Sequence, residues 1–290
     1  MTDMLDLLLK ASIVVFMAGN LLDMGLRLNP PDALRGLRAP RFVAATLIWG
    51  FVAGPALAWG ITKVVPLDAP YAMGLLLLGM TPCAPFLPMI VDKARGDLGY
   101  TAAFMLLTAV GTVVFMPLAA PRLVDGLSVT TWAIARPLLV LVLLPLAAGM
   151  VILRASAPLA SLVQPVVRKS TGVATLAVIV LCAVVYGPGL LGVPGSFALA
   201  AQILFFTPVT ALPYVLGFGM QPAQKLVLSA GMATRNLGAA LAPLFAASGL
   251  DRRAILMVVL GLPVMVVFAL AAAKVFGPAG NVPLPMKGSA

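Results

Sequence analysis

The sequence predicts an all-α, polytopic membrane protein, and three observations support that fold class. Apolar residues make up 62% of the 290 residues and charged residues 10%, whereas a typical soluble domain has about 25% charged residues. The mean hydropathy is +1.10. The apolar residues fall in runs of roughly 20, the length of a helix that crosses a bilayer. These runs do not alternate as transmembrane strands do, so we expect helices.

The chain divides into about nine apolar segments, which we expect to form one transmembrane unit over residues 1–290. Asp3 and Asp6 stand where a secretory signal would carry basic residues, so the first segment is expected to be a true span. The third segment is interrupted by prolines, and the sixth is short. The predicted spans are 7–26, 42–61, 71–91, 99–119, 132–152, 171–186, 197–218, 222–247 and 254–275.

The basic residues predict the orientation. Of the 19 Lys and Arg residues, twelve fall on the side of the C-terminus, among them Arg35, Arg38 and Arg41, and six fall on the other side. Because cytoplasmic loops carry an excess of Lys and Arg, we expect a cytoplasmic C-terminus and an outside N-terminus. The expected location is the cell (inner) membrane.

The composition also argues against several functions. The formal charge of +10 sits in short loops and not on one soluble face, so no nucleic-acid partner is expected. All nine acids are Asp, and the chain has no Glu and no His, so we expect neither an enzyme nor a metal site. Cys83 and Cys182 lie inside apolar segments and are expected to be free, buried thiols.

Two halves of the chain share a pattern at an offset of about 150 residues. Gly54-Pro55 lies at mid-length of the second span, and Thr207-Pro208 lies at a comparable place in the seventh. Asp97 precedes the fourth span, and Asp251 precedes the ninth. Because the offset is five spans, the paired elements have opposite orientations. The sequence therefore predicts an inverted repeat, an architecture of many secondary transporters.

The third span is broken by residues 81–88, TPCAPFLP, in which Pro82, Pro85 and Pro88 recur every three residues. Each proline lacks an amide hydrogen, so the carbonyl four residues earlier loses its helical donor. Each proline also disfavours the helical conformation of the residue before it. We expect an unwound stretch here that lines a cavity or is buried in protein.

The eighth span carries Thr234, Arg235 and Asn236 in a row, although it is apolar on both sides. A charged side chain at mid-membrane usually faces a bundle interior or a substrate path. We expect a second break here, so that two interrupted helices cross and bring positive helix N-termini together. Arg235 is then expected to contact the anionic group of a substrate; the alternative is that it caps carbonyl groups freed by the breaks.

The chain resembles the bile acid:sodium symporter family over nearly its whole length. The matching features are MGLRL at 24–28, GPALAW at 54–59, LLLGMTPCAPFLPMIVDKARGD at 76–97 and GMATRNLGAALA at 231–242. The resemblance implies a core of residues 41–120 and 196–275 containing the two crossed helices. It also implies a panel of residues 7–28 and 129–187, with the substrate between core and panel.

The resemblance further implies sodium sites, and this chain departs from them. The positions of the family's ligands fall on residues without suitable oxygens, namely Gly50, Leu87, Pro88, Met105 and Ala233. The family's shared glutamate falls on Ser229. The remaining candidate ion ligands are Ser229, Thr101 and Asn236. No cofactor is expected beyond a possible Na⁺, and we expect transport to depend weakly or not at all on sodium.

These observations together predict a secondary transporter of small organic anions that works by alternating access. The substrate-binding residues are predicted to be Arg235, Asn236, Thr234, Thr81 and Pro85. Alternatives are a carrier resembling arsenite or metalloid efflux proteins, which Pro82-Cys83 invites, and a proton-coupled or uncoupled organic-acid carrier. The expected partners are a small anion and the lipid bilayer, with monomer and homodimer both open. Asp23 is expected to pair locally with Arg27.

Overall fold

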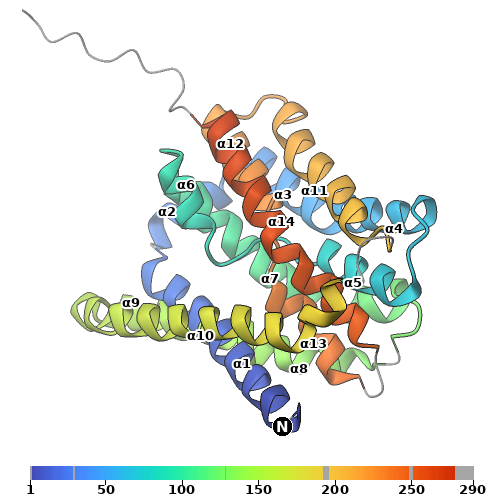
Figure 1. Cartoon of the computed structure of the whole chain (residues 1–290). Helices are drawn as coiled ribbons and strands as arrows, with labels where there is room; N and C mark the ends of the chain where they lie inside the picture. The colour runs from blue at the N-terminus through green and yellow to red at the C-terminus, as the bar shows by residue number, and fades with distance from the viewer. Residues whose placement is uncertain (1, 29, 128, 192–195, 248–250, 278–290) are drawn as a thin grey trace, which may run out of the picture.

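The computed structural model describes residues 2–28, 30–127, 129–191, 196–247 and 251–277, and these form helices joined by short connections (Figure 1). The elements are α1 (Thr2–Arg27), α2 (Pro30–Leu37), α3 (Pro40–Ile48), π-helix η1 (Trp49–Ala53), α4 (Gly54–Val64), α5 (Ala69–Gly79), α6 (Leu87–Lys93), α7 (Leu98–Leu123), α8 (Thr131–Leu138), π-helix η2 (Leu139–Leu143), α9 (Leu144–Ala155), α10 (Ala157–Leu191), α11 (Ala198–Val215), α12 (Pro222–Met232), α13 (Leu237–Ala246) and α14 (Arg252–Phe276).

The predicted class, an all-α polytopic membrane protein, is confirmed, but the predicted count of nine spans is not. Among the described residues, seven continuous helices are long and apolar enough to cross a bilayer. The third and eighth predicted spans are the interrupted pairs α5–α6 and α12–α13. The longest piece of either pair has 11 residues, about 16 Å of helix, so each pair can cross only as a unit.

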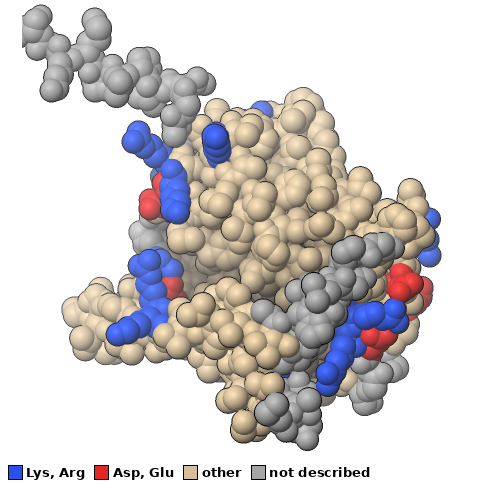
Figure 2. Space-filling view, in the orientation of Figure 1, with Lys and Arg blue, Asp and Glu red and all other residues tan. Residues whose placement is uncertain are grey.

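The outer surface of the helices is apolar, as a membrane-embedded surface must be. Large side chains such as Val52, Val151 and Leu162 are more than 60% exposed on three different helices. Figure 2 shows Lys, Arg and Asp side chains gathered at the edges of the molecule, with a broad uncharged surface between them. Because lipid can cover this surface and water cannot do so favourably, the bilayer is the environment that it fits.

One group of helices consists of α1, α9 and α10, which lie together in the lower part of Figure 1. The α1 and α9 backbones approach closely where Gly25 faces Gly149. A Cβ added to Gly149 would lie 2.6 Å from the Leu22 carbonyl oxygen, so a side chain at this position would push the two helices apart. Small residues at such contacts allow tight packing in membranes, where the hydrophobic effect contributes little.

The other group contains the interrupted helices. α5 packs against α14, and α12 packs against α11 and α14. α7 and α14, the last long helices of the two predicted repeats, start in the same way: Asp97 accepts hydrogen bonds from Gly99 N and Tyr100 N of α7, and Asp251 accepts one from Arg253 N of α14. Each cap satisfies amide groups that the first helical turn leaves free.

Two prolines are each preceded by a π-helical turn, and the helix continues through both of them. η1 immediately precedes Gly54-Pro55, and η2 immediately precedes Leu144-Pro145. A proline cannot donate to the carbonyl four residues before it, and a π-turn is one way in which a helix absorbs that defect. The predicted second and fifth spans are therefore continuous but locally widened.

Two parts of the predicted topology were wrong. Residues 171–186 are not a short separate helix; they belong to α10, which begins at Ala157. The connection expected before residue 171, which includes Arg168 and Lys169, is helical and exposed. Long basic side chains do not end a helix when their charged ends can reach water. The segment between the first two spans also holds α2, where prolines occupy the first turn, a position that suits them.

Candidate functional site

The first interruption is the unwound segment between α5 and α6, residues 80–86. Pro82 and Pro85 lie in it, as predicted. Pro88 does not: α6 begins at Leu87, so Pro88 stands in the first helical turn, where its missing amide hydrogen costs nothing. Cys83 has a left-handed backbone conformation, with φ of 75°, which turns the chain within the segment.

The second interruption is shorter and lies between α12 and α13, at residues 233–236. It contains no proline. Asn236 ends it by capping α13, since its Oδ1 accepts a hydrogen bond of 3.1 Å from Ala239 N. An asparagine cap satisfies one of the free amide groups at a helix start and favours a helix that begins there.

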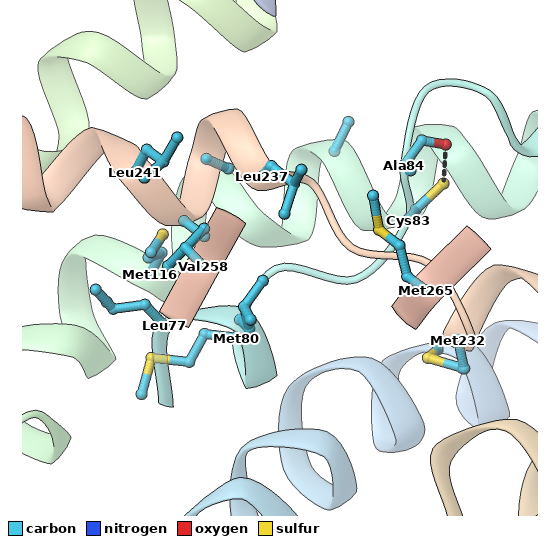
Figure 3. Packing of buried hydrophobic residues seen from close by; sticks show 14 of the residues in the cluster. Leu77, Met80, Cys83, Ala84, Met116, Met232, Leu237, Leu241, Val258 and Met265 are labelled. Atoms are coloured by element: carbon cyan, nitrogen blue, oxygen red, sulfur yellow. Dashed lines mark hydrogen bonds between the residues drawn. The ribbon is translucent and has the colours of Figure 1, made fainter. Parts of the chain in front are cut away.

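The two unwound segments run antiparallel and are hydrogen-bonded to each other. Cys83 N donates to Thr234 O, and Asn236 N donates to Thr81 O, each at 2.9 Å. The Thr234 hydroxyl adds a third link, because it accepts from Ala84 N at 3.0 Å. Figure 3 shows the two segments passing each other, with Met80 and Cys83 on the first segment and Met265 of α14 beside them. The predicted crossing of two broken helices is therefore present, and each break satisfies the backbone of the other.

The carbonyl groups that the first two prolines release all find partners within the crossing region. Leu78 O accepts from Thr81 N, and Thr81 O accepts from Asn236 N. Ala84 O, in the segment before Pro88, accepts from Leu87 N. Arg235 takes part in none of these bonds. The alternative prediction, that Arg235 caps freed carbonyls, is therefore wrong for this conformation.

Arg235 is fully buried and lies beside the crossing. Its guanidinium carbon is 4.8 Å from the centre of the Phe205 ring on α11. An added Cβ on Gly54 would lie 3.7 Å from Arg235 Nη1 and 3.0 Å from Gly79 O, so the guanidinium lies near the last turn of α5. Its three side-chain nitrogens have no hydrogen-bond partner among the described residues.

A cavity with an empty volume of about 240 Å³ lies on another side of the crossing. It is bounded by the first unwound segment, by Asn236 from the second, and by one face each of α1 and α7. This volume includes space that is open to solvent, and the room inside it is about that of one water molecule, far below the roughly 300–1,000 Å³ of sites that enclose drug-sized ligands. The lining residues are Leu21, Met24, Pro82, Cys83, Pro85, Met105, Thr108, Ala109 and Asn236.

The polar side chains of the cavity are few, and among them the Asn236 amide keeps hydrogen-bond donors for a ligand. The Asn236 side chain is 7% exposed, and its Oδ1 is engaged as the helix cap, which leaves its amide N–H groups for a ligand. Cys83 and Thr108 also line the cavity, but the Cys83 thiol donates to Ala84 O and the Thr108 hydroxyl donates to Phe104 O and Met105 O, so neither has a hydrogen left for a ligand. Asn236 begins α13, whose N-terminal end carries a partial positive charge. An anionic group fits this arrangement better than a cation does.

The predicted substrate-binding residues are thus divided by the structure. Asn236 and Pro85 line the cavity. Thr81 and Thr234 lie in the crossing, and the Thr81 hydroxyl donates to the carbonyl groups of its own helix. Arg235 lies outside the lining of the cavity in this conformation.

The predicted ion-binding residues do not come together. The Thr101 hydroxyl donates to Asp97 O at the start of α7, and the Ser229 hydroxyl donates to Thr210 O on α11. Neither residue lines the cavity that contains Asn236. In the part of the chain that the structure describes, no cluster of His, Cys, Asp or Glu could hold a metal ion.

The sequence analysis did not identify the cavity residues of α1 and α7. Leu21 and Met24 come from α1, and Met105, Thr108 and Ala109 come from α7. All five belong to ordinary apolar helix patterns, in which most such residues only pack. Thr108 was the one available signal, because a hydroxyl on a buried helix face usually has a reason to be there.

Other predictions about single residues are confirmed. Cys83 and Cys182 are free and buried. Asp23 forms the predicted ion pair with Arg27, and it also accepts a hydrogen bond of 2.7 Å from Gln164 Nε2 on α10. These contacts tie α1 to α10, which indicates a structural role for the carboxylate.

Comparison with known proteins matches this chain to one family model and to relatives of similar name. The model of the Sodium Bile acid symporter family matches residues 14–191. A probable sodium/metabolite cotransporter of Arabidopsis thaliana chloroplasts is 24% identical over 234 residues, which cover 79% of this chain and 58% of the relative. A probable sodium/metabolite cotransporter of rice chloroplasts (Oryza sativa subsp. japonica) is 25% identical over 236 residues, covering 77% and 54%. The chain spans a little over half the length of both relatives.

Proposed function

This chain belongs to the Sodium Bile acid symporter family, and we propose on that premise that it is a secondary transporter of small organic anions. The observation that carries the proposal is the pair of interrupted helices, which cross and bond to each other beside a cavity. Interrupted helices of this kind form the substrate sites of many secondary transporters. The two relatives are named as sodium/metabolite cotransporters, which is consistent with a small metabolite as substrate.

The cavity chemistry supports an anion as the substrate. The N–H groups of Asn236, the N-terminal end of α13 and the buried charge of Arg235 all favour a negative group near the crossing. Direct contact between Arg235 and the substrate requires a conformation other than this one. We propose that in this conformation Arg235 acts through its charge, and that Asn236 makes the direct hydrogen bond.

We propose that access to the site alternates through movement at the contact between α1 and the crossing. One helical turn before Leu21, Met17 of α1 packs on α13: an added Cβ on Gly238 would lie 2.2 Å from Met17 Cγ. Toward the end of α1, Leu21 and Met24 border the cavity. The Met17 contact with α13 and the cavity beside Leu21 thus lie one helical turn apart along α1. We propose that residues 7–28 and 129–187 form a panel, and that residues 41–120 and 196–275 form a core that moves against it.

We further propose that the protein sits in the cell membrane with its N-terminus outside, and that sodium does not drive transport. None of the described residues that line the cavity carries a carboxylate or an imidazole. That absence argues against both a sodium site and a proton relay in the cavity, and it favours uncoupled transport or exchange of organic acids.

Purified protein in proteoliposomes tests this proposal. Uptake of small carboxylates and sulfonates should saturate, should exchange with substrate inside the vesicles, and should persist when choline replaces sodium. Flux that does not saturate would indicate a channel instead. Uptake that requires a sodium gradient would contradict the coupling proposal and leave the anion proposal intact.

The Cys83 thiol in the cavity favours a second candidate, a carrier of thiophilic metalloid anions such as arsenite. The same vesicles distinguish the two. If arsenite is the substrate, its transport should be lost in Cys83→Ala, whereas carboxylate transport should survive that substitution.

A further inference from the structure

The proposed anion site does not explain how the buried charge of Arg235 is stabilised. Its side chain is fully buried, and its three nitrogens lack hydrogen-bond partners among the described residues. The ion pairs that the structure describes join other residues, such as Asp23 with Arg27 and Asp97 with Arg35. A buried, uncompensated charge costs several kcal/mol. Something other than a carboxylate must therefore make this position favourable for a cation.

The surroundings of the guanidinium supply weak negative charge from three directions. The Phe205 ring lies under it at 4.8 Å, a favourable cation–π distance. The C-terminal end of α5 lies beside it, since Nη1 and Gly79 O both lie within 4 Å of the same point at Gly54. α12 ends at Met232, three residues before Arg235. Helix C-terminal ends carry a partial negative charge, so both interrupted helices present that charge near Arg235.

Such a place is where a broken-helix transporter binds its coupling cation, at helix C-terminal ends and unwound carbonyl groups. We propose that the Arg235 guanidinium is a tethered cation that permanently occupies this position. The inference rests on the proposed transport function and deepens it, because it explains why no free cation is needed. It also implies a latent site: without the Arg235 side chain, the same position beside Phe205 should bind a free guanidinium ion.

The rest of the crossing is consistent with a site already filled. Thr81 O and Thr234 O, the carbonyls that could ligate an ion, accept amide hydrogens from the opposite segment. The hydroxyls of Thr101 and Ser229 donate to helix carbonyls elsewhere. These four oxygens, which include the predicted ion ligands Thr101 and Ser229, are therefore already engaged within the protein.

Chemical rescue of Arg235→Ala tests the proposal by binding alone. Thermal unfolding in detergent would be measured with about 10 mM guanidinium, far below denaturing concentrations. The variant should melt lower than the wild type and regain about 3 °C when guanidinium fills the site at ten times its Kd. Urea, a neutral planar molecule of the same shape, should give no gain. Equal shifts with urea and guanidinium, or none with either, would overturn the proposal.

Two further proteins complete the experiment. Arg253→Ala removes an exposed guanidinium that pairs with Asp68 and Asp251, so guanidinium should not stabilise this matched control. The wild-type protein should show the same melting temperature in sodium and in choline. A sodium-dependent rise in the wild type would contradict a filled site.

If Arg235→Ala does not accumulate, Arg235→Lys decides the question. Lysine keeps the charge, so this variant should fold and stay insensitive to sodium, whereas a lysine variant that sodium stabilises would refute the tethered cation. These measurements report binding and not transport. A chain that binds as described but carries no organic anion would disprove the proposed function and leave this inference standing.

Discussion

The two interruptions of the helices differ in what keeps them unwound. Residues 80–86 contain two prolines and a left-handed Cys83, so their own backbone prevents a continuous helix. Residues 233–236 contain no proline, and side chains hold them open: the Thr234 hydroxyl bonds to the opposite segment, and Asn236 starts a new helix. The first break is intrinsic to its sequence, whereas the second depends on its contacts.

This difference predicts which of the two breaks a substitution can weaken. The second segment is flanked by Ala, Leu and Gly residues that are compatible with a helix. Its backbone groups find hydrogen-bond partners largely in the first segment. Substitutions that leave the first break unchanged should therefore still be able to weaken the second. Substitutions in the second segment are not expected to remove the first break, because proline interrupts a helix whatever lies opposite it.

The largest effect is expected when the link between the two segments is cut. Thr234→Val removes the acceptor of Ala84 N and leaves that buried amide without a partner, which costs about 1–3 kcal/mol. Thr81→Val is the matched control, because Thr81 precedes Pro82 as Thr234 precedes Arg235 and is equally buried. Its hydroxyl only donates to Leu77 O and Leu78 O of its own helix. Denaturation in detergent should therefore show a smaller loss for Thr81→Val; equal losses would show that the cross-link contributes nothing.

The next effect concerns the charge of the cavity. Asn236→Asp keeps a good helix cap but replaces the free amide N–H groups with negative charge. We expect the affinity for an anionic substrate to fall about tenfold or more, since one hydrogen bond to a charged group is worth about 1.5–3 kcal/mol. Binding measured at equal protein stability checks this. An unchanged affinity would remove Asn236 from the substrate site.

The same comparison explains what the sequence could predict. Pro82 and Pro85 act locally, so the place of the first break follows from covalent geometry. Arg235 in an apolar segment locates the second break, because such a charge needs special surroundings. The sequence could not show how many of the three prolines lie in the first break. Pro88 could either interrupt a helix or stand in its first turn, and the neighbouring residues decide between the two.

Contacts between distant segments were beyond the sequence. Thr234 and Ala84 are 150 positions apart, and nothing in either segment specifies that hydroxyl and amide meet. The direction of the Arg235 side chain was also open. It lies toward Phe205 and not in the cavity, an outcome of packing between helices that are distant in the sequence.

A smaller effect is expected at Cys83, where the first segment uses a left-handed residue. An ordinary residue pays about 1–2 kcal/mol for this conformation, and glycine does not. Cys83→Gly should therefore be more stable than Cys83→Ala by about 1 kcal/mol, the two variants having lost the same thiol. Equal melting temperatures would indicate that the crossing fixes this conformation without strain.

The smallest effect concerns the cap of α14 in the second repeat. Hydrogen bonds from the Arg253 side chain and backbone lower the pKa of the Asp251 carboxyl. A lowered folded-state pKa means that the carboxylate stabilises the fold above the unfolded pKa of about 4, and that this contribution is lost as the pH falls through the lower value. The Asp251 side chain is 41% exposed, so solvent screening limits the contribution to a few tenths of a kcal/mol. Asp251→Asn keeps a cap but cannot titrate. The wild type should melt slightly above this variant at about pH 6, and the gap should narrow as the pH falls below about 4; a gap that does not change with pH would show that the cap acts without its charge.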